Sequence, residues 1–232
     1  MVIGGLMGLS LVNYPKLLSA VVFINGCNLN CLYCHNPELI DCKSEGVFSI
    51  QEVLKFLQSR VGLLQGVVIT GGEPLRGDLG VLRGFIGQIK AMGYKVKLDT
   101  NGLYPKKLQS LIEDSLLDFV AMDIKNTKNK YEKTVVRKIK LEKLEESIKI
   151  IQNSGLDYEF RTTVCNELHT KEDLLEIMDW IKGSRKYFIQ QYRATEGVNS
   201  HQLNPLDESI IEEVLKRSRA NLGLVEVRNS YK

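Results

Sequence analysis

Short apolar runs alternate along the chain with longer segments in which apolar residues recur at helical spacing. Buried strands are predicted at 20–24, 66–70, 95–100, 117–123, 158–164 and 187–191. Apolar residues at i, i+3 and i+4 predict helices that include 53–57, 82–89, 108–112, 141–151 and 174–178. Ser49 with Glu52, and Thr170 with Asp173, have the spacing of capping boxes and indicate two helix starts.

Strands that alternate with helices are typical of a parallel sheet with right-handed crossovers. Six such units predict an open β/α barrel or a flat doubly wound sheet, and both bind ligands at the carboxyl ends of the strands. We expect one domain, with an N-terminal extension at 1–18, a barrel core at 19–192 and a C-terminal helix and edge segment at 193–232. In that last part, 208–221 has helical character and 222–227 is apolar.

The chain has 232 residues, of which 44% are hydrophobic and 25% charged, and a formal net charge of +3. These values are ordinary for a globular protein and neither demand nor exclude an anionic partner. Five cysteines, three of them close together, argue against a disulfide framework and for a reducing, cytoplasmic location. The apolar residues 1–12 lack the basic start of a signal peptide. No run approaches the ~20 apolar residues of a membrane span, so no membrane association is expected.

The most informative stretch follows the first predicted strand, where Cys27, Cys31 and Cys34 stand in C-x3-C-x2-C spacing. Three thiolates this close together indicate a metal centre. Zinc sites usually take their remaining ligands from a second, separated pair, which this sequence does not show. An iron–sulfur cube on three thiolates leaves one iron without a protein ligand, and an open position is what a catalytic metal needs. A structural zinc site or a fortuitous cysteine cluster remains the alternative.

With Tyr33 before the last cysteine, this spacing resembles the signature of the radical S-adenosylmethionine (SAM) enzymes. The resemblance implies a [4Fe-4S] cluster on Cys27, Cys31 and Cys34, whose open iron binds SAM. It further implies that reduction of the cluster cleaves SAM to methionine and a 5′-deoxyadenosyl radical. The implied fold is a partial, laterally open (β/α)6 barrel. Tyr33 is expected to pack against the adenine or, alternatively, within the loop.

Polar motifs follow three later strands: Gly71-Gly72-Glu73-Pro74, Asp99-Thr100-Asn101-Gly102 and Asp123-Ile124-Lys125. Glycines let a ligand approach the backbone closely. The first motif resembles the one that receives the methionine amino group of SAM in this family. Taken singly, the three motifs also fit a tight turn, an Asn-Gly turn and a surface ion pair.

Resemblance to the branch that activates glycyl-radical enzymes assigns further roles. It implies a monovalent-cation site at Asp99, Thr100, Ala121 and Asp123. Arg161 lies in an apolar strand and needs an anionic partner, which is either the SAM carboxylate or an internal bridge to Asp123 or Glu159. The SAM-binding residues expected from the resemblance are Tyr33, Gly71, Gly72, Glu73, Asp99, Asn101, Lys125, Arg161 and Gln190.

Residues 10–15, 34–39, 70–74 and 99–102 resemble the activating proteins of anaerobic ribonucleoside-triphosphate reductase, which are related to pyruvate formate-lyase activating enzyme. The implied reaction removes a Cα hydrogen from a glycine of a partner enzyme and leaves a glycyl radical. Flavodoxin or ferredoxin is the implied electron donor. Asn13 and the segment 126–128 depart from the family pattern where a protein substrate would be read.

Two other functions remain open on the sequence alone. One is a radical SAM enzyme that modifies a small molecule or an RNA base, and the other is a zinc-binding interaction module without catalysis. RNA modifiers often carry an additional binding domain, for which the chain has no room, so no nucleic-acid partner is expected. The lysine-rich segment 125–143 is either a solvated face or a docking surface for an acidic partner.

Overall fold

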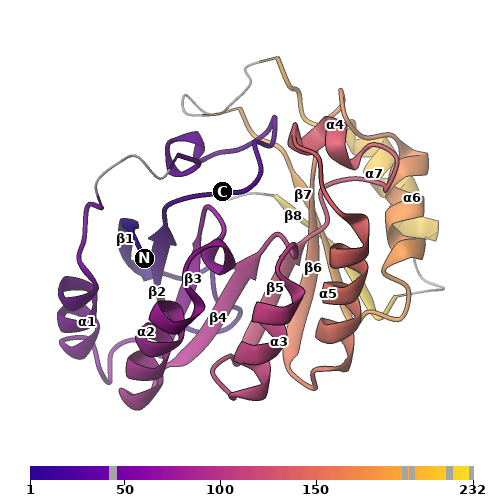
Figure 1. Cartoon of the computed structure of the whole chain (residues 1–232). Helices are drawn as coiled ribbons and strands as arrows, with labels where there is room; N and C mark the ends of the chain where they lie inside the picture. Colours follow the sequence, from indigo (N-terminus) through magenta and orange to yellow (C-terminus); the bar gives the residue numbers. More distant parts are fainter. Residues whose placement is uncertain (42–45, 195–197, 199–201, 218–221, 230–232) are drawn as a thin grey trace.

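The computed structural model describes residues 1–41, 46–194, 198, 202–217 and 222–229. One eight-stranded sheet runs through them, with its strands side by side in sequence order (Figure 1). The first pair is antiparallel, and all later pairs are parallel. The strands are β1 (Ile3–Ser10), β2 (Ser19–Ile24), β3 (Gly66–Gly71), β4 (Lys95–Thr100), β5 (Phe119–Asp123), β6 (Asp157–Val164), β7 (Lys186–Gln191) and β8 (Leu224–Asn229).

Helices connect the parallel strands. They are α1 (Ile50–Gln58), α2 (Leu79–Ala91), α3 (Pro105–Glu113), α4 (Tyr131–Val135), α5 (Leu141–Asn153), α6 (Lys171–Trp180) and α7 (Glu208–Arg217), with short 3-10 helices η1 (Pro37–Leu39) and η2 (Pro74–Arg76). Both predicted capping boxes are confirmed, since the side chains of Ser49 and Thr170 accept from the third amide of their helices. These bonds satisfy backbone donors that the first turn of a helix leaves free.

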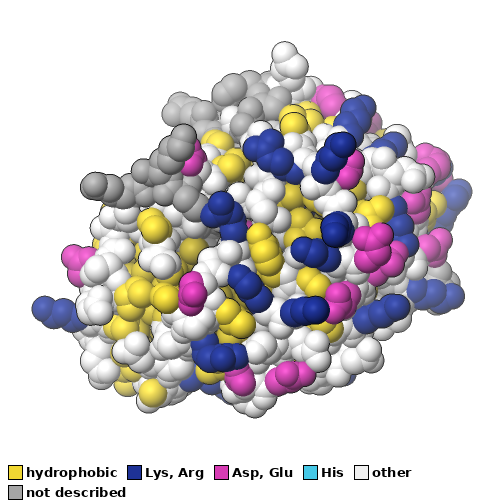
Figure 2. Space-filling model, viewed as in Figure 1, with side chains coloured by type: hydrophobic (Ala, Val, Ile, Leu, Met, Phe, Trp, Pro, Cys, Tyr) yellow, Lys and Arg dark blue, Asp and Glu magenta, His cyan; other side chains and the backbone are white. Residues whose placement is uncertain are grey.

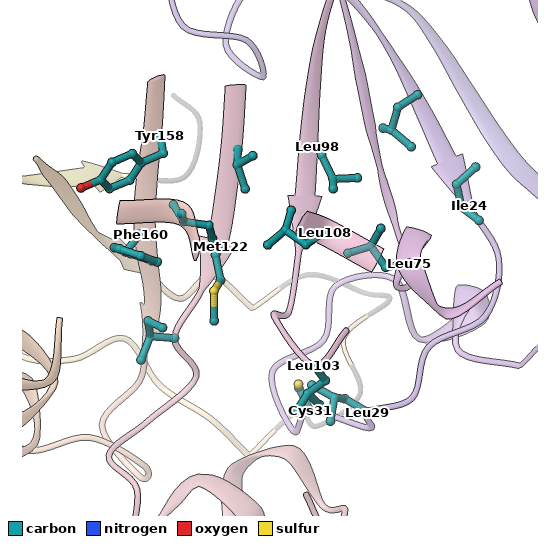
Figure 3. Close-up of a cluster of buried hydrophobic side chains, with 14 of the residues drawn as sticks. Ile24, Leu29, Cys31, Leu75, Leu98, Leu103, Leu108, Met122, Tyr158 and Phe160 are labelled. Carbon is teal, nitrogen blue, oxygen red and sulfur yellow. The ribbon is translucent and has the colours of Figure 1, made fainter. Parts of the chain in front are cut away.

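The two faces of the curved sheet have different surroundings. Apolar side chains on the outer face pack against the helices and form the main core, part of which is drawn in Figure 3. The inner face carries a smaller cluster, made of Tyr14, Val21, Val68, Phe119 and Ala121, to which no described helix contributes. A doubly wound sheet would be covered by helices on both faces. The laterally open β/α barrel is therefore confirmed.

Among the strands and α-helices, β1 and α4 are not predicted by the hydrophobic pattern. β1 contains three glycines and has low intrinsic strand propensity, and it becomes a strand because it pairs with β2. α4 has only five residues, too few for a helical period to show. The apolar run at 222–227, by contrast, does form most of β8 at the opposite edge of the sheet. In the described ranges, no helix has the length and apolar character that crossing a membrane requires.

Candidate active site

A pocket lies at the carboxyl ends of the parallel strands, where the predicted polar motifs meet. The loop after β2 forms one wall, and residues at the ends of β3, β4, β5 and β6 form the other. The predicted site residues that line it are Cys27, Cys31, Tyr33, Cys34, Gly71, Gly72, Asp99, Thr100, Asn101, Asp123, Lys125 and Arg161. Glu73, Ala121 and Gln190 are not among its lining residues.

The loop that carries the three cysteines is fixed by backbone hydrogen bonds to two other segments. The amide of Gly26 donates to the carbonyl at the end of η1 at 2.7 Å. The amides of Asn30 and Leu32 donate to the carbonyls of Val135 and Thr134 in α4, at 3.0 and 3.2 Å. α4 therefore positions the cysteine loop, and the lysine-rich segment that contains α4 lies beside it.

Cys27, Cys31 and Cys34 are free thiols. Burial is the main reason why the pKa of each is raised, to about 12 for Cys31. The positive charge of Lys125 lowers the pKa of all three. Metal binding requires the thiolate form, so Lys125 favours the form that binds metal.

The three thiols fit the ligand set of an iron–sulfur cube. They come from one loop and line one pocket. Within the described residues, no three His, Cys, Asp or Glu side chains converge as the ligands of a single metal ion do. In a cube, each thiolate binds a different iron atom, so the ligands need not converge on one point.

Gly71 and Gly72 hold the end of β3 against the start of the cysteine loop. Gly71 has a φ of 110°, and a Cβ at this position would overlap the backbone of Ile24. A Cβ on Gly72 would overlap the carbonyl of Gly26. Only glycine at both positions allows this close approach, so the Gly-Gly pair determines how near β3 comes to the cysteine loop.

Glu73 does not line the pocket. Its side chain is 1% exposed, and its oxygens accept hydrogen bonds from the amides of Leu75 and Asn101 and from the hydroxyl of Thr100, at 3.0, 2.6 and 2.9 Å. Burial raises the pKa of Glu73 to about 7, although these three donors oppose the shift. The contacts tie the end of β3 to the end of β4, while direct SAM binding by Glu73 stays a prediction.

Glu73→Gln is expected to remove a pH dependence of stability from the metal-free protein. The folded-state pKa lies above the unfolded value, so ionised Glu73 disfavours folding, and this cost grows from pH 4.5 until it is complete above pH 7. The difference in free energy of unfolding, variant minus wild type, should therefore increase by about 2.5 kcal/mol between pH 5 and pH 8. Urea unfolding at both pH values measures this gain. A constant difference between the two proteins would show that Glu73 does not titrate in this range.

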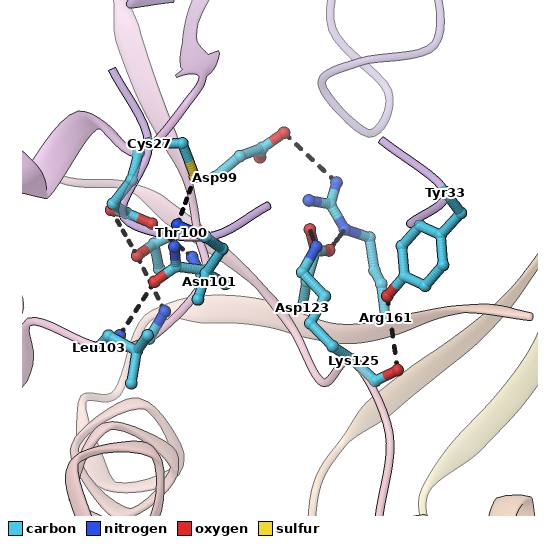
Figure 4. A network of polar contacts seen from close by, with 12 residues as sticks. Cys27, Tyr33, Asp99, Thr100, Asn101, Leu103, Asp123, Lys125 and Arg161 are labelled. Carbon is cyan, nitrogen blue, oxygen red and sulfur yellow. Dashed lines mark hydrogen bonds and ion pairs between the residues drawn. The ribbon is translucent and has the colours of Figure 1, made fainter. Parts of the chain in front are cut away.

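Five charged side chains form a continuous series of ion pairs across the inner face of the sheet, which we call the charge chain. Figure 4 shows the part at Asp99, Arg161 and Asp123. Lys97 Nζ lies 2.5 Å from Asp99 Oδ1, and Arg161 Nη1 lies 3.3 Å from Asp99 Oδ2. Arg161 Nε lies 2.8 Å from Asp123 Oδ1, and Lys125 Nζ lies 2.8 Å from Asp123 Oδ2. Three cations thus alternate with two carboxylates.

Burial and neighbouring charges act in opposite directions on these groups. Burial raises the pKa of Asp99 and Asp123, but the adjacent cations outweigh it and leave both values lowered. Burial lowers the pKa of Lys97, and Asp99 only partly offsets this effect. The internal bridge expected for Arg161 is therefore present, and its side chain lines the pocket as well.

Of the remaining predicted residues, Tyr33 and Asn101 line the pocket, whereas Gln190 and Ala121 do not. Tyr33 is 3% exposed, and its hydroxyl donates to the carbonyl of Lys125 at 3.4 Å. The Asn101 amide group donates to Asn28 in the cysteine loop at 2.9 Å. Gln190 lies on β7 opposite Thr163, which does line the pocket. The carbonyl oxygen of Ala121 is the only atom with which this buried residue could bind a cation, since its side chain carries no ligand atom.

Sequence reasoning assigned no role to two residues beside the site. His169 Nδ1 accepts from the amide of Cys165 at 3.3 Å, so Nε2 carries the proton donated to the Lys125 carbonyl at 3.1 Å. Burial lowers the pKa of His169 and so favours the neutral ring. Asn126, within the segment that departs from the family pattern, is fully buried and bonds Thr134 of α4.

Other residues singled out in the sequence lie elsewhere. Asn13 accepts a hydrogen bond from Ser10 at 2.5 Å in the turn before β2, at the end of the strands opposite the pocket. Cys42 and His201, for which the sequence predicts no role, lie outside the described residues.

Comparison with known proteins identifies the family of this chain. A sequence profile of the radical SAM superfamily matches residues 21–181. A candidate glycyl-radical enzyme activating enzyme of Methanocaldococcus jannaschii is 33% identical over 194 residues, which cover 82% of this chain and 79% of that protein. The pyruvate formate-lyase-activating enzyme of Clostridium pasteurianum is 28% identical over 226 residues, which cover 92% of each chain.

A solved structure agrees with the fold. Streptococcus suis SuiB bound to S-adenosylmethionine superimposes with a TM-score of 0.70 at 13% identity, over 90% of this chain and 52% of SuiB. This chain thus spans about half the length of SuiB. At this identity the similarity concerns the fold alone.

Proposed function

The chain belongs to the radical SAM superfamily and to its activating-enzyme family, and from this premise we propose that it installs a glycyl radical in a partner enzyme. One observation carries the proposal. The three cysteines, the Gly-Gly strand end and the cationic side chains of Lys125 and Arg161 all line the same pocket. A wall that carries three thiols therefore faces groups suited to the methionine part of SAM.

The roles proposed for the residues follow from their chemistry. Cys27, Cys31 and Cys34 would hold a [4Fe-4S] cluster. Lys125 and Arg161 would bind the SAM carboxylate, because their charges are partly exposed to the pocket and the charge chain has one unneutralised positive charge. The exposed backbone at Gly71 and Gly72 would receive the methionine amino group. Tyr33, Asn101 and Gln190 are proposed for the adenosine part.

When bound, the reduced cluster and SAM supply hydrogen-atom abstraction by a 5′-deoxyadenosyl group, with methionine and 5′-deoxyadenosine as products. The protein supplies binding, orientation and exclusion of water. The sheet does not close, since β1 and β8 are its two edges, and a glycine loop of a macromolecule could approach through this side. The resemblance also predicts a monovalent cation near Asp99 and Asp123, which stays a prediction.

The proposal is tested in two steps with anaerobically reconstituted protein. SAM and a reductant should first give 5′-deoxyadenosine and methionine in equal amounts. A candidate glycyl-radical enzyme is then added, and electron paramagnetic resonance should show a glycyl radical on it. Anaerobic ribonucleotide reductase is the proposed target, and pyruvate formate-lyase is the comparison. An intact cluster that cleaves no SAM would refute the proposed activity, whereas cleavage without a radical on either enzyme would refute these targets.

An acidic one-electron carrier such as flavodoxin or ferredoxin is proposed as the electron donor, bound at a basic groove. This groove is lined by Lys138, Lys140 and Lys143 together with Tyr104 and Asn28. Asn28 directly follows the cluster cysteine Cys27 in sequence. Lys and Arg side chains gather over α4 and the neighbouring ends of α3 and α5 (Figure 2). A negatively charged carrier bound there would be steered close to the cluster.

Charge reversal in the basic groove, Lys138→Glu with Lys140→Glu, is expected to slow SAM cleavage about 10-fold when an acidic carrier protein supplies the electrons. The rate with dithionite should not change, because a small reductant needs no docking surface. Lys55→Glu with Lys182→Glu is the matched control, since both lysines are exposed on other parts of the barrel. Equal carrier-driven rates for the two double variants would exclude the groove as the docking site.

A further inference from the structure

Lys97 is a charged residue on the inner face of β4 that no expected role accounts for. Its side chain is 2% exposed, and its ammonium group lies 2.5 Å from Asp99 Oδ1. On the inner face it also lies 5.8 Å from the centre of the Phe119 ring. We propose that the Lys97 ammonium is a built-in counter-cation, which takes the place of the monovalent metal ion predicted at Asp99 and Asp123.

The first argument is that the predicted ion would find no unpartnered side-chain oxygen. Both oxygens of Asp99 contact cations, one the ammonium of Lys97 and the other the guanidinium of Arg161. Both oxygens of Asp123 are likewise engaged, by Arg161 and Lys125. The Thr100 hydroxyl donates to Glu73 and accepts from the amide of Gly102. Apart from Ala121, all the predicted ligands of the ion therefore already have partners within the protein.

The second argument is the charge balance of the charge chain. Its two carboxylates face three cations, so one positive charge remains for an anionic ligand. Glu159, whose Oε1 lies 3.9 Å from Arg161 Nη1, does not alter this balance, because Arg228 donates to both of its oxygens at 2.7 Å and supplies the compensating positive charge. If Lys97 were neutral, the two cations and two carboxylates left in the charge chain would sum to zero. A bound ligand carboxylate would then leave one negative charge without a compensating cation. This part of the argument rests on the proposed SAM binding.

The third argument is chemical equivalence. An ammonium group carries the same charge as K⁺ or Na⁺ and donates to the same carboxylate oxygens. Replacing Lys97 by methionine keeps the length of the side chain and removes the charge. Asp99 Oδ1 then loses its partner in a buried position, which is costly unless another cation enters. Loss of Lys97 should therefore create a requirement for a small monovalent cation that the wild type does not have.

The test measures ion binding by metal-free protein without SAM, so its outcome does not depend on the proposed enzymatic activity. Thermal unfolding of the wild type, Lys97→Met and the control Lys95→Met is followed as KCl or NaCl replaces tetramethylammonium chloride at constant ionic strength. Lys95 lies on the same strand with its side chain 62% exposed. Lys97→Met should show a saturating rise in melting temperature of about 4 °C at 100 mM of the preferred ion. The wild type and Lys95→Met should change by less than about 1 °C.

Relaxation of ²³Na in nuclear magnetic resonance gives a second readout, with site-bound Na⁺ expected on Lys97→Met alone. A saturable, ion-specific stabilisation of the wild type would overturn the proposal. So would a folded Lys97→Met that responds alike to all three salts. If the variant folds only with K⁺ or Na⁺ present, the proposal is supported. If the variant folds in none of the three salts, the titration of the wild type decides. A wild-type melting temperature that does not depend on the ion supports the proposal, and an ion-specific rise contradicts it.

Discussion

Replacement of Cys27, Cys31 or Cys34 by alanine should abolish SAM cleavage and reduce the bound iron to a small fraction of the wild-type content. Each thiolate would hold a different iron of the cluster, so two remaining ligands cannot retain it. The variants should stay folded, because the cysteine loop is fixed by backbone hydrogen bonds to η1 and α4, which the substitutions leave in place. Iron and sulfide analysis, 5′-deoxyadenosine formation and circular dichroism measure the three quantities.

Cys165→Ala is the matched control for these variants. Cys165 is also a buried free thiol, but it lies after β6, where its amide donates to His169. This variant should retain iron and activity. Full iron content in all three loop variants would contradict the cluster assignment. Zinc in place of iron in the wild type would favour the non-catalytic interaction module instead.

Arg161→Met should lower the free energy of unfolding by about 2–3 kcal/mol, because two partly buried carboxylates lose the cation that they share and each keeps only one other cation. It should also weaken SAM binding about 100-fold, since a paired charge beside the ligand carboxylate is lost. Urea unfolding gives the first quantity, and equilibrium binding to reconstituted protein at a temperature where the variant is folded gives the second. Both effects have one origin, the central place of Arg161 in the charge chain.

Two further variants separate these effects. Arg161→Lys keeps the charge but loses the two-pronged contact, so it should recover part of the stability and part of the affinity. Arg185→Met removes an exposed arginine near the ring of Tyr158 and should change the free energy of unfolding by less than about 1 kcal/mol. Normal SAM binding by a folded Arg161→Met protein would confine Arg161 to a structural role.

Most of the fold could be predicted because buried parallel strands are short, uninterrupted apolar runs. The run at 95–100 is β4 without change, and the other five predicted strands differ from the structure by one or two residues at their ends. β1 could not be predicted in this way. Its glycines give no strand preference, and the strand exists only through its pairing with β2, which is information that lies outside the segment.

The location of the candidate site could be predicted from the sequence, but the side-chain contacts within it could not. Residues that end neighbouring parallel strands must meet at one edge, which is why Gly71, Asp99 and Asp123 line the same pocket. Which way each side chain faces depends on the curvature of the sheet and on its partners. Glu73 follows the Gly-Gly pair, yet its carboxylate binds Thr100 and the backbone instead of lining the pocket. Lys97 lies two residues before Asp99 on the same face of β4 and so joins the same ion-pair network.

The attachment of the cysteine loop to α4 determines what happens to the loop when oxygen destroys a bound cluster. The hydrogen bonds of Asn30 and Leu32 to α4 are made by backbone groups and do not involve the metal. Destruction of an iron–sulfur cluster by air would therefore leave a loop that still has its shape. Iron and sulfide should therefore enter the metal-free protein without refolding of this loop.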